Sequence, residues 1–386
     1  ALDSYLPKLL NAGKKVAICD QTETPVSGKL VKRAITRILT PGTTLEDRQL
    51  QAGKNHYLLA LNLTKQGLCA AWLDLSTGDF SIAAEEEFSA LAPILSSLDP
   101  KEILVPQEAS RTWVALGGGP LKPTDNEAHK AWAQEFAALS ANKPVTGMPD
   151  YFFETLAGAE LVVKTLKLAN LEGFGIDVKH PGLGTAGAVL TYATESLRMA
   201  PQNLSAIRAY RADNCLLLDP ATLRNLEIFD SGRGGREASL LSAINRTVSA
   251  AGARLLERWL AAPLVDLGEL QRRQTLVGEL MGAGALGNSL QESLKRVRDI
   301  ERILARLQNR VRNPRELGAL PETLGVLPEI CHSLECFESL DIPALRKRVN
   351  PLPALKKKLE DAIVDEPPSD IREGGVFREG FDERLD

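Results

Sequence analysis

The chain has 386 residues, 44% of them hydrophobic and 25% charged, and its formal net charge at neutral pH is −4. This length favours two or three domains. The mild negative charge excludes a uniformly basic nucleic-acid-binding protein, although it leaves room for local basic patches. No apolar run approaches the roughly 18 residues that a membrane span needs, and the N-terminus has no signal-peptide pattern. Five scattered cysteines are typical of reduced thiols, so we expect a cytoplasmic protein.

Residues 1–50 predict the end of an α+β domain. An amphipathic helix over residues 4–11 is closed by Gly13, and a strand follows over residues 15–20. One helix and a strand or two cannot bury a core, and the chain lacks an initiator Met. We therefore expect a segment of a longer protein, cut within a domain at each end.

A group of cations lies in the following stretch, residues 29–39, with no acid between Glu23 and Glu46. Its members are Lys29, Lys32, Arg33 and Arg37. Clustered Lys and Arg side chains without neighbouring acids favour phosphate contact.

Residues 53–203 alternate strands and helices, which predicts a parallel or mixed sheet with helices on its faces. The expected strands are 56–63, 68–75, 80–83 and 102–106. The expected helices are 85–98, 151–170 and 186–199. The stretch 110–149 is too irregular to assign.

Residues 204–386 change to a helical pattern. Asp219 followed by Pro220 predicts an N-cap and first turn. Apolar residues recur at helical spacing in several later stretches. These are 240–259, 267–281, 297–311, 314–327 and 353–364, with a helical pattern beginning again after 374.

Two glycine-rich stretches resemble nucleotide-binding motifs. Gly182 to Gly187 has the spacing G-x-G-x-x-G, but it lacks the following strand and acid of a dinucleotide site. Glycines that let a helix pack closely are the favoured explanation. Gly282 to Ser289 imitates a phosphate-binding loop but has Asn288 where the Lys is needed. We expect no bound cofactor and no ATP hydrolysis by this chain.

Acidic and metal-ligating residues offer one catalytic alternative. Asp74, with Glu85 and Glu102 as further candidates, could hold metal ions in a nuclease that resembles RNase H. Nothing in the sequence makes these acids converge, and residues 74–79 also have the composition of a hairpin turn, which we favour. Cys331 and His332 have no second ligand pair at zinc-site spacing, so no metal site is expected.

Arginines recur every four residues along the helix expected at 297–311. They are Arg298, Arg302, Arg306 and Arg310, with acids interspersed. This pattern is typical of a solvated, salt-bridged helix face; a row of phosphate contacts is the alternative.

Several strings together resemble the MutS family of bacterial DNA mismatch-repair proteins. Residues 14–25 (KKVAICDQTETP) and 31–43 (VKRAITRILTPGT) resemble the end of the family's mismatch-recognition domain. Residues 217–229 (LLDPATLRNLEIF) and 239–264 resemble the start of its helical core, and 299–307 (DIERILARL) continues that core.

The resemblance implies a multidomain α/β and all-α architecture. Residues 1–50 are the end of the recognition domain, 53–203 an RNase H-like α/β connector, and 204–386 the first part of the core with its long lever helices. It also implies mismatched double-stranded DNA as ligand of the full-length protein, a homodimer, MutL as partner, and a DNA-dependent ATPase that uses ATP and Mg²⁺.

Two functions remain to be compared. In the first, the segment links DNA-gripping parts to the ATPase and offers a docking face for MutL, with Lys32, Arg33 and Arg37 as DNA-backbone contacts. In the second, it is a metal-dependent nuclease centred on Asp74. The missing carboxylate set favours the first, with no catalytic residue in this chain.

Overall fold

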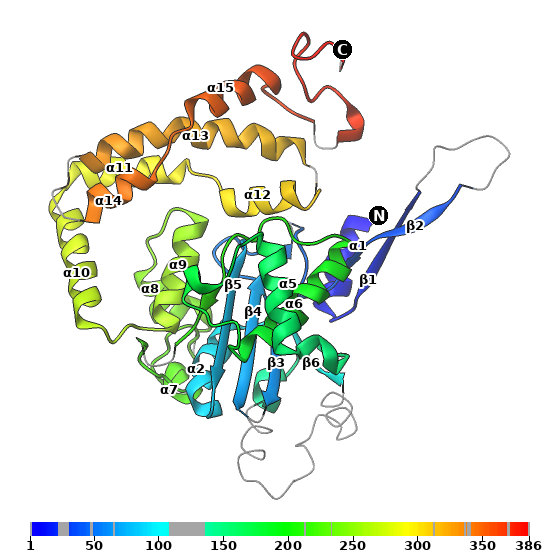
Figure 1. The fold of residues 1–386 in the computed structure, drawn as a ribbon. Coiled ribbons are helices and arrows are strands. Elements are labelled where there is room, and N and C mark those ends of the chain that lie inside the picture. The colour runs from blue at the N-terminus through cyan, green and yellow to red at the C-terminus, as the bar shows by residue number, and fades with distance from the viewer. Residues whose placement is uncertain are drawn as a thin grey trace, which may run out of the picture.

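The computed structural model describes residues 2–21, 31–46, 49–64, 66–107, 136–211, 214–232, 234–311, 313–335, 337, 341–368 and 371–384. Figure 1 shows a narrow projecting ribbon, a central sheet with helices on both sides, and a curved layer of helices above it. The chain is therefore mixed α/β in its first half and mostly helical in its second, as the sequence predicts.

The first part is a helix packed against a two-stranded antiparallel ribbon. Helix α1 spans Leu2–Asn11, β1 spans Val16–Gln21 and β2 spans Arg33–Leu39. A small apolar cluster joins helix and ribbon at one end. The other end of the ribbon extends away from the body of the molecule (Figure 1).

A six-stranded mixed sheet forms the centre of the described chain, in the order β7-β6-β3-β4-β5-β8. Strands β3, β4 and β5 pair antiparallel in succession, whereas β6 is parallel to β3, β7 to β6, and β8 to β5. The strands are Tyr57–Thr64, Gly67–Asp74, Asp79–Glu85, Glu102–Pro106, Val145–Met148 and Arg208–Ala209. The expected strands are confirmed, and β7 lies in the stretch left unassigned.

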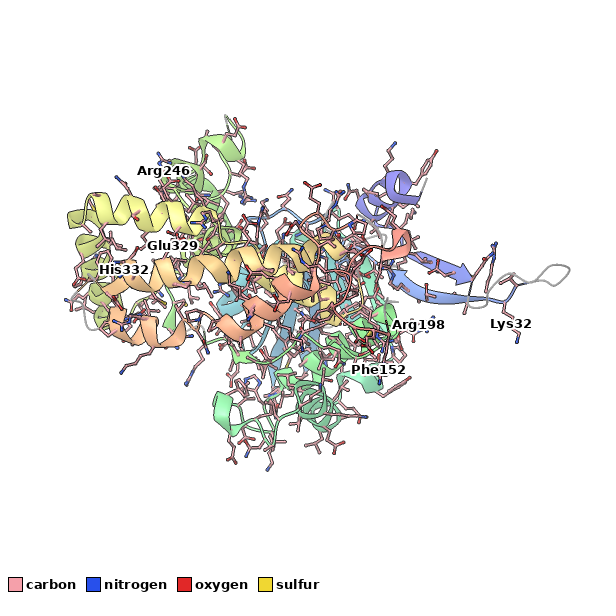
Figure 2. The ribbon with its side chains drawn as sticks, turned by 90° about the horizontal axis from the view of Figure 1, so that it is seen from above. Lys32, Phe152, Arg198, Arg246, Glu329 and His332 are labelled. Atoms are coloured by element: carbon pink, nitrogen blue, oxygen red, sulfur yellow. The ribbon has the colours of Figure 1, made fainter. Side chains whose placement is uncertain are left out.

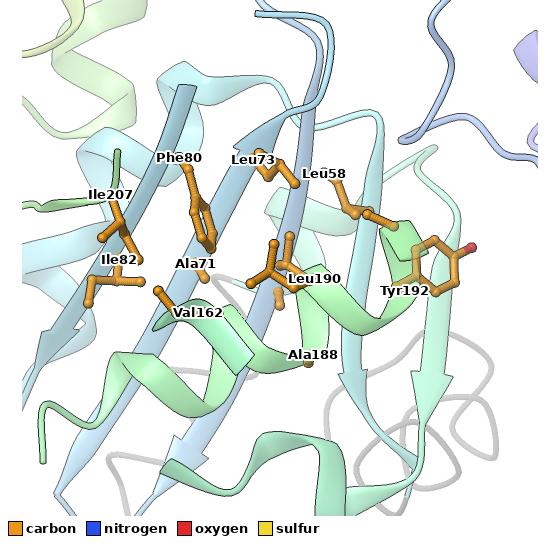
Figure 3. Packing of buried hydrophobic residues seen from close by; sticks show 14 of the residues in the cluster. Leu58, Ala71, Leu73, Phe80, Ile82, Val162, Ala188, Leu190, Tyr192 and Ile207 are labelled. Atoms are coloured by element: carbon orange, nitrogen blue, oxygen red, sulfur yellow. The ribbon is translucent and has the colours of Figure 1, made fainter. Parts of the chain in front are cut away.

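Each face of the sheet is covered by helices. Helix α2 (Phe88–Leu98) packs on one face, while α5 (Thr155–Leu166) and α6 (Gly182–Leu197) pack on the other. Figure 3 shows side chains of α5 and α6 meeting those of the strands. Alternate residues of β3 and β4 point to opposite cores, which explains why residues 57–61 and 68–73 are continuously apolar.

The G-x-G-x-x-G stretch is part of the α5–α6 contact. A Cβ on Gly184 would lie 2.1 Å from the carbonyl oxygen of Phe153, and one on Gly187 would lie 2.7 Å from the Cα of Gly158. These glycines let two backbones approach closely, as the favoured explanation predicts.

Residues after 214 form a succession of helices. They are α7 (Pro220–Asn225), α8 (Leu240–Ile244), α9 (Ala250–Ala261), α10 (Leu267–Gly282), α11 (Ala285–Lys295), α12 (Ile300–Gln308), α13 (Pro314–Glu335), α14 (Asp341–Arg348) and α15 (Pro353–Ala362). Asp219 caps α7 as predicted, because its carboxylate accepts hydrogen bonds from the backbone N–H groups of Ala221 and Thr222. In the described chain, no helix has the length and apolar character needed to cross a membrane.

Two helical expectations are wrong in detail. The periodic run over 240–259 is broken, because the Asn245 side chain holds the Thr247 N–H and Ser249 caps a new helix. The pattern after residue 374 is not an α-helix: Gly374 and Gly375 have positive φ, and Phe377 forms a bridge with Ile363. That bridge ties the backbone into an extended conformation.

Replacing Gly158 with Ala tests the helix contact. The added Cβ would lie 2.0 Å from the carbonyl oxygen of Leu183, and relief requires the two helices to separate. We expect a loss of about 3 kcal/mol in the free energy of unfolding, measured with urea. The matched control is Gly173→Ala, since a Cβ there meets nothing within 4 Å. Equal stability of the two variants would contradict the close packing.

Candidate nucleic-acid interface and domain junctions

The candidate DNA-contacting cations lie on β2 or just before it. Lys32 and Arg33 are exposed, and Figure 2 shows Lys32 towards the outer end of the ribbon. Arg37 is half-buried near the base, where its guanidinium lies 3.2 Å from the carboxylate of Glu46. The expectation of a cluster remote from any acid is therefore wrong for Arg37, because the Thr40–Thr43 turn folds Glu46 back onto the strand. Lys29 falls outside the described residues.

A buried carboxylate holds the base of the ribbon to the sheet. Glu102, at the start of β6, is fully buried. It accepts hydrogen bonds from the hydroxyls of Thr40, Thr146 and Tyr192, at 2.6, 2.8 and 2.5 Å, and from the Gly42 N–H at 3.2 Å. The Lys15 ammonium lies 3.6 Å away. These partners come from the ribbon, the sheet and α6, so we call this set the Glu102 junction.

The hydrogen bond from Tyr192 to Glu102 affects the protonation of the Tyr192 hydroxyl. Burial, together with the nearby Glu102 carboxylate, raises the pKa of the Tyr192 hydroxyl, so this phenol stays protonated and donates. The hydrogen bonds from Thr40 and Gly42 to Glu102 hold the buried residues 40–45 against the sheet. The carboxylate is thus committed to holding two segments together and is not offered to a metal ion.

Asp74 belongs to a hairpin turn, as favoured from the sequence. One of its oxygens accepts from the Ser76 N–H at 2.9 Å and from the Ser76 hydroxyl at 2.6 Å. The other accepts from the His56 N–H at 2.9 Å. Glu85 is at the opposite end of the β4–β5 hairpin, since Asp74 pairs with Asp79 and Leu68 with Glu85. Glu85 therefore does not converge with Asp74, and within the described residues no three acids are grouped to hold a metal ion.

The arginine-rich helix α12 does not present a solvated face. Arg302 and Arg306 are only 2% and 5% exposed. Arg306 pairs with Glu316 on α13 at 2.7 Å, while Arg298 pairs with Glu322 at the surface. The prediction is wrong because the stripe faces other parts of the protein; neither a solvent face nor a row of phosphate contacts fits the two buried members.

Arg302 and its neighbour Arg254 bind the chain that connects the ribbon to the sheet. Arg302 donates to the carbonyl oxygens of Gln51 at 2.9 Å and Lys54 at 2.5 Å, and Arg254 donates to that of Ala52 at 2.9 Å. We call residues 49–56 the linker. Asp299, at the N-cap of α12, accepts two hydrogen bonds from Arg254, at 2.7 and 2.9 Å.

Arg254, Asp299 and Arg302 form what we call the arginine junction. Burial alone would raise the pKa of the Asp299 carboxyl, but hydrogen bonds from Arg254 and the charges of Arg254 and Arg302 outweigh it, so the pKa lies below its usual value. Burial would likewise lower the pKa of Arg254, yet hydrogen bonds to its two carboxylate partners, Asp299 and Glu301, and their charges raise that pKa. The junction is therefore fully charged at neutral pH.

The C-terminal end of α12 makes a second contact with the sheet domain. Asn309, 4% exposed, donates from its amide to the side-chain oxygen of Asn203 at 2.8 Å. Its own oxygen accepts from the Gln202 N–H at 3.2 Å. Figure 1 shows α12 between the sheet and α13. One short helix thus fastens the sheet domain to the helical part at both of its ends.

Two remaining motifs lie in the helical part of the chain. Gly282 ends α10, Gly284 lies between α10 and α11 with a positive φ of 46°, and Gly287 belongs to α11. His332 lies 3.3 Å from Glu335. Across the residues that the structure describes, no group of three potential ligands is placed to hold a metal ion.

Sequence analysis missed Arg254, Glu102 and Asn309 as junction residues. No periodic signal marks Arg254, because the large apolar residues Leu255 and Trp259 of α9 are exposed whereas Arg254 is buried. Glu102 stands at the edge of an otherwise apolar strand, where an acid requires several donors once it is buried.

Comparison with known proteins agrees with this arrangement. Family models match in chain order: MutS domain I over residues 1–48, MutS domain II over 56–208 and MutS domain III over 221–382. The DNA mismatch repair protein MutS of Symbiobacterium thermophilum is 36% identical over 392 residues, covering 100% of this chain and 42% of that protein. The chain therefore belongs to the MutS family, and it spans about 42% of the length of this curated relative.

The charge of Asp299 predicts a pH dependence of stability. Because its pKa is lowered on folding, its contribution is fully present above the ordinary value of 3.8 and is lost as the pH falls through the lower folded value. The free-energy gap between the wild type and Asp299→Asn should be constant from about pH 7 to 5 and shrink below about pH 4, in urea titrations. A gap of the same size at the lowest pH would contradict the ion-paired state.

The nuclease alternative predicts metal-dependent cleavage of DNA that requires Asp74. We expect no cleavage when the purified chain is incubated with Mg²⁺ or Mn²⁺ and branched or nicked DNA, because the acids lie apart. Cleavage by the wild type that disappears in Asp74→Asn would overturn this interpretation.

Proposed function

We propose that this chain is the part of a longer mismatch-recognition protein that couples a DNA-contacting ribbon to the helical core. The observation that carries the proposal is the continuous set of buried polar contacts between them. The Glu102 junction fixes the base of the ribbon to the sheet, and the arginine junction fixes the linker to α9 and α12. A displacement of the ribbon is therefore passed to the core.

The domain assignment follows the resemblance and the topology. Residues 1–50 would be the end of the recognition domain, 53–203 the connector and 204–386 the first part of the core. Three successive antiparallel strands with parallel strands added beside the first support an RNase H-like connector. In this protein the connector would have this fold but would not act as a nuclease.

Lys32, Arg33 and Arg37 would contact the DNA backbone. The ribbon projects from the body, so a duplex can approach it without collision with the sheet domain (Figure 1). The exposed Arg33 guanidinium lies at the start of β2, where two strands hold the backbone in place. Cations on such a rigid support suit phosphate oxygens. Arg37, paired with Glu46, would contribute less.

The longer protein would act as MutS-family proteins do. It would bind mismatched double-stranded DNA as a homodimer, use ATP and Mg²⁺ in a part other than this chain, and recruit MutL. The connector would offer MutL a docking face. A cytoplasmic location is consistent with these partners.

Replacing Arg33 and Arg37 with Gln in the longer protein tests the ribbon. Each lost phosphate contact should reduce the slope of log K against log salt by about 0.9, so binding to a mismatched duplex weakens most at low salt. Because Arg37 is paired with Glu46, Arg33→Gln alone should account for most of the effect. Fluorescence anisotropy measures both quantities, and Lys179→Gln, an exposed lysine on the connector, is the control. Unchanged affinity and slope in the double variant would remove the ribbon from the DNA interface.

A further inference from the structure

Residues 346–358 form a second cationic surface, far along the chain from the ribbon. We call this the basic segment: it joins the end of α14 to the first half of α15. It contains six cations, and no acid occurs between Asp341 and Glu360. They are Arg346, Lys347, Arg348, Lys356, Lys357 and Lys358.

Most of these cations are not neutralised by the protein. Arg346 lies 3.4 Å from Glu335, and Lys356 lies 2.8 Å from Glu360. The other members are exposed and have no ion pair or hydrogen bond within the described part of the chain. They are Lys347, Arg348, Lys357 and Lys358.

The α15 part of the segment lies on the outer side of the helical layer. Both α14 and α15 pack against α13, and Figure 1 shows α15 on the side of α13 away from α12 and the sheet. The cations therefore take no part in either domain junction. An external ligand can reach them without disturbing the arginine junction.

The charge order of α15 opposes the stability of the helix. Lys356, Lys357 and Lys358 lie in the middle of α15, and Glu360 and Asp361 lie near the negative end of its dipole. The one ion pair, from Lys356 to Glu360, has the cation before the acid, which is the weaker order. Helix stability therefore does not account for the α15 lysines, whereas Lys347 and Arg348 lie in the last turn of α14, where cations favour the helix dipole.

We propose that the basic segment is a second, sequence-independent contact for the phosphates of double-stranded DNA. It rests on the proposed function for the presence of DNA, but it concerns a different surface from the ribbon. Two exposed cations at the end of α14 and two in the middle of α15 fit successive phosphates, which recur along a duplex with a uniform negative charge. The contact involves no base, so paired and mismatched duplexes bind to it with equal affinity.

The test uses this chain and a fluorescent, fully paired duplex of about 20 base pairs, titrated by anisotropy from about 30 to 200 mM salt. The variant carries Lys347→Gln, Arg348→Gln, Lys357→Gln and Lys358→Gln. We expect the slope of log K against log salt to fall by about 3 to 4, and the affinity at the lowest salt to fall at least tenfold, roughly. With a mismatched duplex, the slope and the affinity should fall by the same amounts.

The matched control removes four exposed cations from the connector, with Lys164→Gln, Lys167→Gln, Lys179→Gln and Arg198→Gln. Its slope and affinity should equal those of the wild type. The urea midpoint of the basic-segment variant is measured beside its binding. Lys347 and Arg348 lie in the last turn of α14, where cations favour the helix dipole, so we expect at most a small decrease. A variant that stays folded under the assay conditions shows that a loss of binding is not a loss of folding.

Three outcomes would overturn the proposal. The first is no measurable DNA binding by the wild-type chain at the lowest salt, and the second is an unchanged slope in the basic-segment variant. The third is a basic-segment variant that still binds DNA but no longer binds poly-L-glutamate, which would indicate an acidic protein partner. The ribbon is judged separately: Arg33→Gln in the longer protein tests mismatched-DNA binding, and its failure leaves the basic-segment result standing.

Discussion

The arrangement of this chain depends on the burial of two guanidinium groups. Arg254 and Arg302 are 5% and 2% exposed, and a charge at that depth is tolerated only when its donors are satisfied. Two carboxylates, Asp299 and Glu301, balance their charge, and three linker carbonyl oxygens take further N–H groups. The linker can follow only the path that brings those carbonyls to the arginines. The sheet domain, which begins where the linker ends, is oriented by the same contacts.

The Glu102 junction extends this constraint to the ribbon. A fully buried carboxylate with donors from three segments fixes residues 40–45 against the sheet, just ahead of the linker. The chain between ribbon and core is therefore held by polar contacts at each end, and these contacts are directional. An apolar interface would allow sliding, whereas hydrogen bonds at 2.5 to 2.9 Å are lost by a small rotation. This is the physical basis for coupling between DNA and the core.

Local patterns in the sequence predicted four of the six strands of the sheet, the main helices, the Asp219 cap and the Asp74 turn, because each depends on residues close together in the chain. The same logic failed for α12. A row of arginines with acids beside it has the pattern of a surface helix, and its burial depends on carbonyl oxygens some 250 residues away, as the Arg302 to Gln51 contact illustrates. Glu46 reaches Arg37 only because a turn reverses the chain. Tertiary partners of charged groups leave no periodic signal.

Hydrogen exchange of the linker amides tests the coupling most directly. In Arg302→Gln, the account predicts faster exchange across residues 49–56, with β3 and β4 still protected, because the linker loses two hydrogen bonds while the sheet keeps its core. Arg310→Gln is the matched control, since Arg310 belongs to the same stripe but is exposed. Linker exchange in Arg302→Gln that is as slow as in the wild type would contradict the claim that the arginine junction holds ribbon, sheet and core together.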